Sequence, residues 1–108
     1  MTTSLTLDTT RGDDGNLVLI ATGEIDLSNI EVFDQALTTA HNAAASSGET
    51  LTVDLSAVEY LDSAAINALF ISADHISLIA HPLLMPIFVM SGLDKLVAIE
   101  SAALPADS

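Results

Sequence analysis

The 108-residue sequence contains no cysteine, which excludes disulfide bonds, thiolate metal sites and cysteine nucleophiles. It also lacks an apolar run long enough to cross a membrane. The N-terminus has neither the basic region nor the apolar stretch of a secretory signal. Together these absences predict a cytoplasmic protein.

Basic residues are almost absent as well. Two Lys and Arg residues stand against fifteen Asp and Glu residues, which gives a formal net charge of -13. Such a charge repels phosphate backbones and anionic lipid surfaces, so we expect no direct binding to nucleic acid or to a membrane. The charge chiefly favours solubility, and any protein partner is expected to present a basic surface.

The hydrophobic content of 50% fits one domain with one core. We expect this domain to cover residues 1–108, with a frayed tail over 102–108. Apolar runs separated by turn residues predict strands near 5–7, 17–21, 51–55, 76–80 and 97–99. The first two are expected to pair antiparallel, and helices separate the others. This order predicts an α/β fold, with a small mixed β-sheet and crossover helices.

Ser28 is predicted to be the N-cap of the first helix. Ser28 and Glu31 have the spacing of a capping box, and Leu27 and Val32 have that of a hydrophobic staple. Gly48 is expected to end the helix, because glycine readily adopts the left-handed cap conformation. One apolar stripe lies between these ends, formed by Ile30, Phe33, Leu37, Ala40 and Ala44.

The last helix, predicted over 83–90, has no charged side. Pro86 falls early enough to be tolerated in its first turn. Apolar character all round indicates burial or an interface. One hypothesis is a homodimer through 83–90. The alternatives are that the core encloses this helix because the helix near Ser63 is short, or that part of the run is a strand.

Ser63 is the leading candidate for the functional atom. A buried-strand pattern ends at Asp62-Ser63 and passes into a short helix of small residues. A helix start offers unpaired N–H groups and the positive end of a dipole, which favour a phosphoryl group. On local grounds alone, an ordinary N-cap is the simpler explanation. The loops 23–26 and 60–63 both follow strands, so we expect them to share one edge of the sheet.

No enzymatic activity is expected. Carboxylate pairs such as Glu24 with Asp26 arise by chance in so acidic a chain, and the sequence has no nucleophile–base constellation or Gly-rich phosphate loop. His41, His75 and His81 lack the spacing of metal ligands. We therefore predict no catalytic residue, no metal and no cofactor.

Three segments, taken in order, resemble the bacterial anti-sigma factor antagonists, which are stand-alone STAS domains. Residues 53–63, VDLSAVEYLDS, resemble the stretch around the regulatory serine of that family. Residues 23–26, GEID, resemble its N-terminal loop, and residues 90–93, MSGL, resemble its late S-G-L motif. Together the three segments span most of the chain, from residue 23 to residue 93.

The resemblance implies a switch. Unphosphorylated protein would bind an anti-sigma factor that is also a serine kinase, phosphorylation of Ser63 would end that binding, and a phosphatase would reset it. Asp26 and Asp62 would lie near the phosphoacceptor. The resemblance implies a partner-binding set of Glu24, Asp26, Asp62, Ser63, Ala64 and Asn67.

The sequence departs from the family pattern after Ser63. Ala64 and Ala65 stand where the family usually has a second hydroxyl residue and a glycine, and the segment from Ser63 to Ser91 is shorter than usual. These departures favour an alternative: a phosphorylation-independent STAS module that serves as a scaffold, an oligomer subunit or a nucleotide sensor. Asp54, inside a predicted strand, is assigned no functional role.

Overall fold

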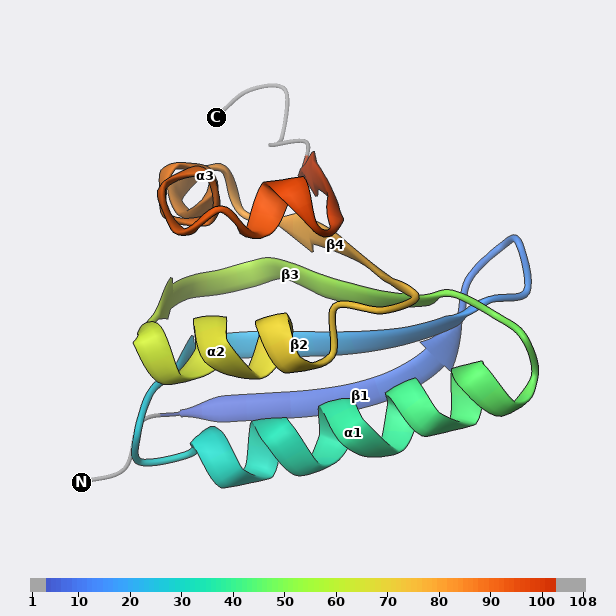
Figure 1. Ribbon diagram of the computed structural model, residues 1–108. Coiled ribbons are helices and arrows are strands. Elements are labelled where there is room, and N and C mark those ends of the chain that lie inside the picture. The colour runs from blue at the N-terminus through green and yellow to red at the C-terminus, as the bar shows by residue number, and fades with distance from the viewer. Residues whose placement is uncertain (1–3, 103–108) are drawn as a thin grey trace, which may run out of the picture.

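Five strands form a single mixed sheet in the order β1-β2-β3-β4-β5 (Figure 1). β1 pairs antiparallel with β2, and every later neighbour pairs parallel, which confirms the predicted α/β fold. The computed structural model describes residues 4–102, so most of the predicted tail lies outside the described residues. The strands are β1 (Leu5–Arg11), β2 (Leu17–Ile25), β3 (Leu51–Leu61), β4 (Ile76–Ala80) and β5 (Ala98–Ser101).

Three α-helices connect the parallel strands. They are α1 (Ile30–Ser46), α2 (Ser63–Ile71) and α3 (Met85–Ser91), and the 3-10 turns η1 (Pro82–Leu84) and η2 (Leu93–Lys95) flank α3. Because β2 to β5 follow one another in space as in sequence, right-handed crossovers bring all the helices to one face of the sheet. Figure 1 shows α1 and α2 side by side, with α3 towards the β4 end.

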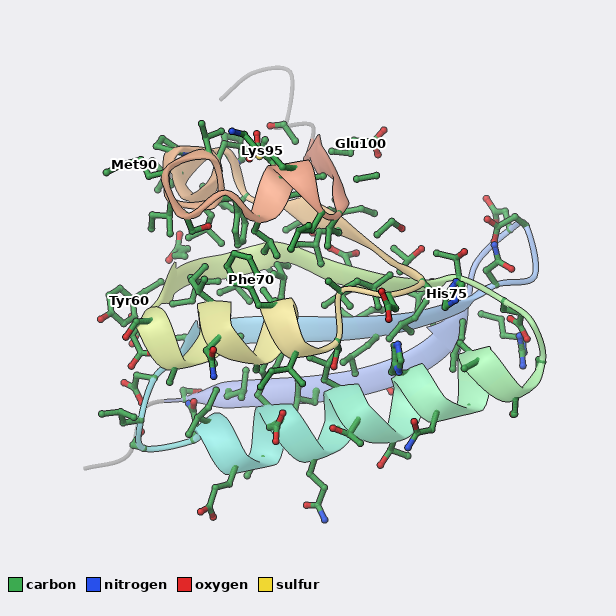
Figure 2. All side chains as sticks on the ribbon, in the orientation of Figure 1. Tyr60, Phe70, His75, Met90, Lys95 and Glu100 are labelled. Carbon is green, nitrogen blue, oxygen red and sulfur yellow. The ribbon has the colours of Figure 1, made fainter. Side chains whose placement is uncertain are left out.

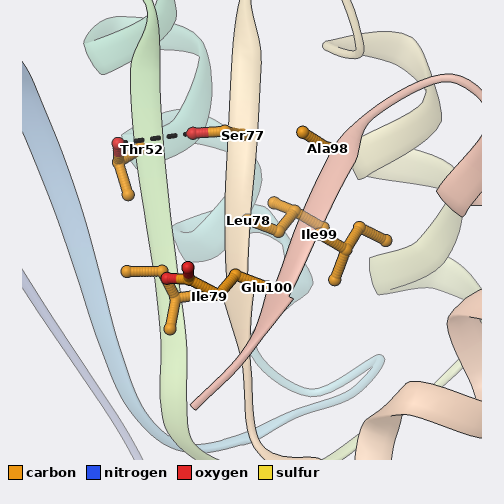
Figure 3. A pocket seen from close by; sticks show the side chains of 7 residues that line it. All are labelled: Thr52, Ser77, Leu78, Ile79, Ala98, Ile99 and Glu100. Carbon is orange, nitrogen blue, oxygen red and sulfur yellow. Dashed lines mark hydrogen bonds between the residues drawn. The ribbon is translucent and has the colours of Figure 1, made fainter.

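The core lies between this face and the helices. Alternate residues of β3 and β4 are buried there, and Phe33, Leu69 and Phe88 pack against them from α1, α2 and α3. Among the described residues, no helix covers the other face of the sheet, and the central residues of that face are half-buried. Figure 3 shows part of that face, where the hydroxyl oxygens of Thr52 and Ser77 lie 3.4 Å apart.

β3 is longer than predicted, with 11 residues in place of the five at 51–55. The apolar alternation of its first half breaks after Leu55, where the pairing with β2 shifts register between Ile20 and Thr22. Asp54 Oδ1 accepts from both the backbone N–H and the hydroxyl of Ser56, at 2.9 and 2.6 Å. The irregular step lets the strand continue to Leu61 without losing its buried side.

The predicted N-cap of the first helix is wrong by one residue. α1 begins at Ile30 with Asn29 at the N-cap position, while the Ser28 hydroxyl donates to Asp26 Oδ1 at 2.6 Å. Leu27 and Val32 are 78% and 57% exposed, so they form no hydrophobic staple. The apolar stripe is confirmed by the burial of Phe33, Leu37, Ala40 and Ala44, and Gly48 follows the helix with φ +70°.

The last predicted helix divides into η1 and α3, with Pro86 in the first turn of α3 as expected. The His81 ring nitrogen Nδ1 accepts from the Leu83 N–H at 3.1 Å and caps the start of η1. Pro86 has no N–H to donate to the Pro82 carbonyl, so a continuous α-helix through both segments would lose that hydrogen bond. Phe88 is fully buried, but Met90 is 87% exposed, so the core encloses only one side of α3. Within residues 4–102, no helix is long and apolar enough to cross a membrane.

Candidate functional site

Residues 23–26 and 60–63 lie together at one edge of the sheet, as predicted, but residues 23–25 and 60–61 are the last residues of β2 and β3 and not loop residues. Glu24 is the register partner of Tyr60, and Ile25 is that of Leu61. Just beyond the paired residues, the Asp62 N–H donates to the Ile25 carbonyl at 3.2 Å. Two of the segments that resemble the STAS family are therefore joined directly.

Gly23 fits a position that no other residue fits without strain. Its φ is +115°, and a Cβ there would collide with the carbonyl oxygen of Ser4. That same carbonyl accepts from the Glu24 N–H at 3.0 Å. The glycine of the GEID segment thus allows the chain before β1 to lie against the last residues of β2.

Asn29 holds the loop after β2 in shape. Its side chain is buried, with Oδ1 accepting from the Asp26 N–H at 3.0 Å and Nδ2 donating to the Glu24 carbonyl at 2.9 Å. Asn29 was not predicted to have this role, because Ser28 and Glu31 have the spacing of a capping box. Glu24 itself is exposed, while the half-buried Asp26 carboxylate binds Ser28 within the loop.

Asp62 caps α2. It adopts an extended backbone, and its Oδ1 accepts from the N–H groups of Ala64 and Ala65 at 3.0 and 3.3 Å. Ser63 is therefore not the N-cap, which corrects the simpler local explanation of this residue. It occupies the first helical position, it is exposed, and its hydroxyl lies outside the cap.

Ser63 borders a groove between α2 and α3. We define the apolar groove by its lining residues, Leu61, Asp62, Ser63, Ile66, Ile87, Met90 and Ser91. Ile66 and Ile87 are its partly exposed aliphatic walls, and Figure 2 shows Met90 pointing outward from α3. A hydroxyl at the edge of an accessible apolar surface can be modified and can then change what that surface binds.

The third resembling segment completes the same groove. The Ser91 hydroxyl donates to the Phe88 carbonyl at 3.0 Å and accepts from the Leu93 N–H at 3.3 Å. Gly92 has φ +82° and ends α3, and Leu93 is fully buried. This turn fixes the end of α3 opposite Ser63, a proximity that no local pattern in the sequence indicated.

The other two expected binding residues lie on the opposite flank of α2. Ala64 and Asn67 line a second groove, between α1 and α2, which we call the acidic groove. Its remaining lining residues are Ile30, Glu31, Asp34, Ala68 and Ile71. The expected set thus divides between the two flanks of one helix and the adjoining loops.

Two of the three histidines make structural contacts. His41 Nε2 lies 2.6 Å from the Asp74 carbonyl, and His81 caps η1. Across residues 4–102, no group of three or more His, Asp and Glu side chains is arranged to hold a metal ion.

Comparisons with known proteins agree with this geometry. Residues 9–98 match the family described as "Mlab, STAS domain". A solved anti-sigma factor antagonist from Mycobacterium paratuberculosis is 28% identical, with a TM-score of 0.77 over 90% of this chain and 86% of that one. No curated protein matches the sequence.

The anti-sigma factor antagonist SpoIIAA shares the fold in two states. The unphosphorylated form is 16% identical, with a TM-score of 0.67 over 91% of this chain and 89% of that one. The phosphorylated form, described as a Bacillus cell fate determinant, is also 16% identical, with a TM-score of 0.63 over 91% and 92%. Since the family match spans residues 9–98, the chain belongs to the STAS-domain family.

Proposed function

We propose that the protein is an anti-sigma factor antagonist of the bacterial cytoplasm, which binds an anti-sigma factor with serine kinase activity and is switched off by phosphorylation of Ser63. The observation that carries the proposal is the exposed Ser63 hydroxyl, outside the α2 cap and on the rim of the apolar groove. The structural similarity to the Mycobacterium paratuberculosis antagonist supports the role.

The Asp62 cap favours an outward orientation of a phosphoryl group on Ser63. Asp62 Oδ1 already accepts from the N–H groups of Ala64 and Ala65, so less of the helix N-terminus is free to bind the phosphate. The nearby carboxylate also repels a group that carries about -1.5 to -2 charges. The phosphate would therefore sit at the rim of the apolar groove.

A charge at this rim opposes binding. An apolar partner side chain entering the groove would have to strip water from the phosphate, and burying an unpaired charge is costly. In the unphosphorylated state the rim carries only a neutral hydroxyl at this position, which is far easier to desolvate. Phosphorylation would thus act directly on the contact surface and requires no change of fold.

The remaining proposed partner-binding residues have different tasks. Glu24, Ala64 and Asn67 would contact the partner. Asp26 and Asp62 are engaged in their own loops by short hydrogen bonds, so we assign them a positioning role. The protein itself would act as a substrate of the kinase, with a separate phosphatase restoring the hydroxyl.

Intact-mass spectrometry tests the proposal. The anti-sigma factor kinase that co-purifies with the protein from its native bacterium is incubated with the purified chain and ATP. We expect one phosphate on the wild type and on Ser56→Ala, a matched control in β3, and none on Ser63→Ala. Phosphate on Ser63→Ala, or none on the wild type, contradicts Ser63 as the switch.

A second candidate function is a phosphorylation-independent binding module. It is favoured by Ala64 and Ala65, which remove the family's second hydroxyl residue and glycine next to Ser63. Such a module would bind its partner equally well before and after modification. Capture of an anti-sigma factor that does not phosphorylate the protein supports this candidate over the first.

A further inference from the structure

The acidic groove has two chemically different walls. On α1, Glu31 and Asp34 are exposed and lie one helical turn apart. On α2, the small side chains of Ala64 and Ala68 form the floor of the groove beside Ile71, which is 76% exposed. An exposed isoleucine beside two carboxylates is suited to a ligand that is itself part apolar and part charged.

Among the residues that the structure describes, no basic side chain pairs with the carboxylates of this groove. The whole sequence has two basic residues other than histidine, Arg11 and Lys95. The Arg11 guanidinium lies 2.8 Å from Glu49, in an ion pair. Figure 2 shows Lys95 beside α3, on the opposite side of the molecule from α1. Within residues 4–102, neither basic side chain is placed to pair with Glu31 and Asp34, which leaves both carboxylates available to a basic group of another molecule.

Helix stabilisation explains only one of the two carboxylates. Glu31 lies in the first turn of α1, where a negative charge interacts favourably with the helix dipole. That effect fades beyond the first turn, and Asp34 lies past it. A binding role accounts for both residues.

We propose that the acidic groove binds a basic amphipathic segment of the protein's partner. An aliphatic side chain of the segment packs on Ala64, Ala68 and Ile71, and its lysine or arginine reaches Glu31 and Asp34. The inference rests on the proposed function, in which that partner is the anti-sigma factor. It adds a contact surface that does not include Ser63.

Size and charge make two other occupants less suited to the groove. The groove has a volume of about 230 Å³, below the ~300–1,000 Å³ that small-molecule sites usually have. A second copy of the chain carries the same formal charge of -13 and is repelled. Side chains from a basic protein fit both constraints.

The two grooves should respond oppositely to added negative charge. A phosphate on Ser63 interferes with apolar contact on one flank of α2, but it strengthens the attraction of the other flank for a basic segment. The acidic groove would therefore steer the partner to the surface, which raises the association rate and makes it sensitive to salt. The apolar groove alone would then make the partner bind the unphosphorylated protein in preference to the phosphorylated protein.

Association kinetics with the purified anti-sigma factor test the inference. The double variant Glu31→Gln/Asp34→Asn is compared with Asp13→Asn/Glu100→Gln, which removes the same charge from distant exposed positions. We expect the first variant to bind about 3- to 10-fold more weakly at low salt, chiefly through slower association, and like wild type near 0.5 M salt. The control should stay within about twofold of wild type.

Equal losses in the two double variants, or a loss that persists in high salt, would overturn the inference. Both results leave the proposed function intact, because binding and its control by Ser63 are measured separately. If no anti-sigma factor binds the wild type, the proposed function fails and a second probe decides the groove.

That probe is a helical peptide with leucine and arginine on one face, compared with its counterpart bearing glutamate for arginine. In NMR titrations of the isotope-labelled full chain, we expect the arginine peptide to shift the amide signals of Ala64, Ala68 and Ile71. The glutamate peptide should shift none of them. Shifts confined to other surfaces, or equal shifts from both peptides, overturn the inference.

Discussion

The two flanks of α2 present opposite chemistry, although a single nine-residue helix forms a wall of each groove. The apolar groove has Ser63 at its rim, so its binding depends on removing water and is sensitive to one added charge. The acidic groove has Glu31 and Asp34 on its wall, so it acts at a distance and is sensitive to salt. One helix can thus place the phosphorylation-controlled contact on one flank and the contact that attracts the partner on the other.

The largest effect on stability is expected in the core contact of α2, because this contact holds the helix that forms a wall of both grooves. Leu69 is the fully buried residue on the inward side of α2. Leu69→Ala should therefore lower the free energy of unfolding by about 2–5 kcal/mol. Ile71→Ala, on the exposed side of the same helix, should change it by no more than about 0.5 kcal/mol. Urea denaturation followed by circular dichroism measures both values. Similar losses in the two variants would show that α2 packs with a different face inward.

The next effect concerns the apolar groove alone. Met90→Ala should weaken binding of the anti-sigma factor about tenfold, because it removes an accessible apolar contact near Ser63. Val89→Ala is the matched control, since Val89 is also exposed but lies outside the groove. Calorimetric titration gives the two affinities, and equal values would remove Met90 from the contact surface.

The homodimer hypothesis competes for this same surface. Light scattering on the free protein at high micromolar concentration distinguishes the two uses of residues 83–90. A dimer that Met90→Ala converts to a monomer would assign the apolar groove to self-association. We expect both the wild-type protein and Met90→Ala to be monomers.

A smaller effect concerns the cap that leaves the Ser63 hydroxyl free. Asp62→Ala should cost about 1 kcal/mol of stability, because two N–H groups of α2 lose their acceptor. Ser63→Ala should stay within about 0.5 kcal/mol of wild type. Thermal unfolding compares the two variants. A costly Ser63→Ala beside a neutral Asp62→Ala would mean that Ser63 caps the helix after all.

Much of the fold was accessible from the sequence, because strand order and crossover handedness follow from local patterns and general topology rules. The same reasoning brought 23–26 and 60–63 to one edge. It failed where side chains compete over short distances: Ser28 had the capping pattern, but Asp26 binds its hydroxyl and Asn29 takes the N-cap position. Both grooves escaped prediction, because Met90 and Asp34 reach α2 only through the tertiary fold.

The central claim is that the charge on Ser63 decides whether the apolar groove binds. Isothermal titration of the purified anti-sigma factor into unphosphorylated protein, enzymatically phosphorylated protein and Ser63→Ala tests it most directly. We predict equal affinities for the unphosphorylated protein and Ser63→Ala, and an affinity at least about thirtyfold lower for the phosphorylated protein, equivalent to about 2 kcal/mol. Equal affinities for the phosphorylated and unphosphorylated protein would contradict the claim.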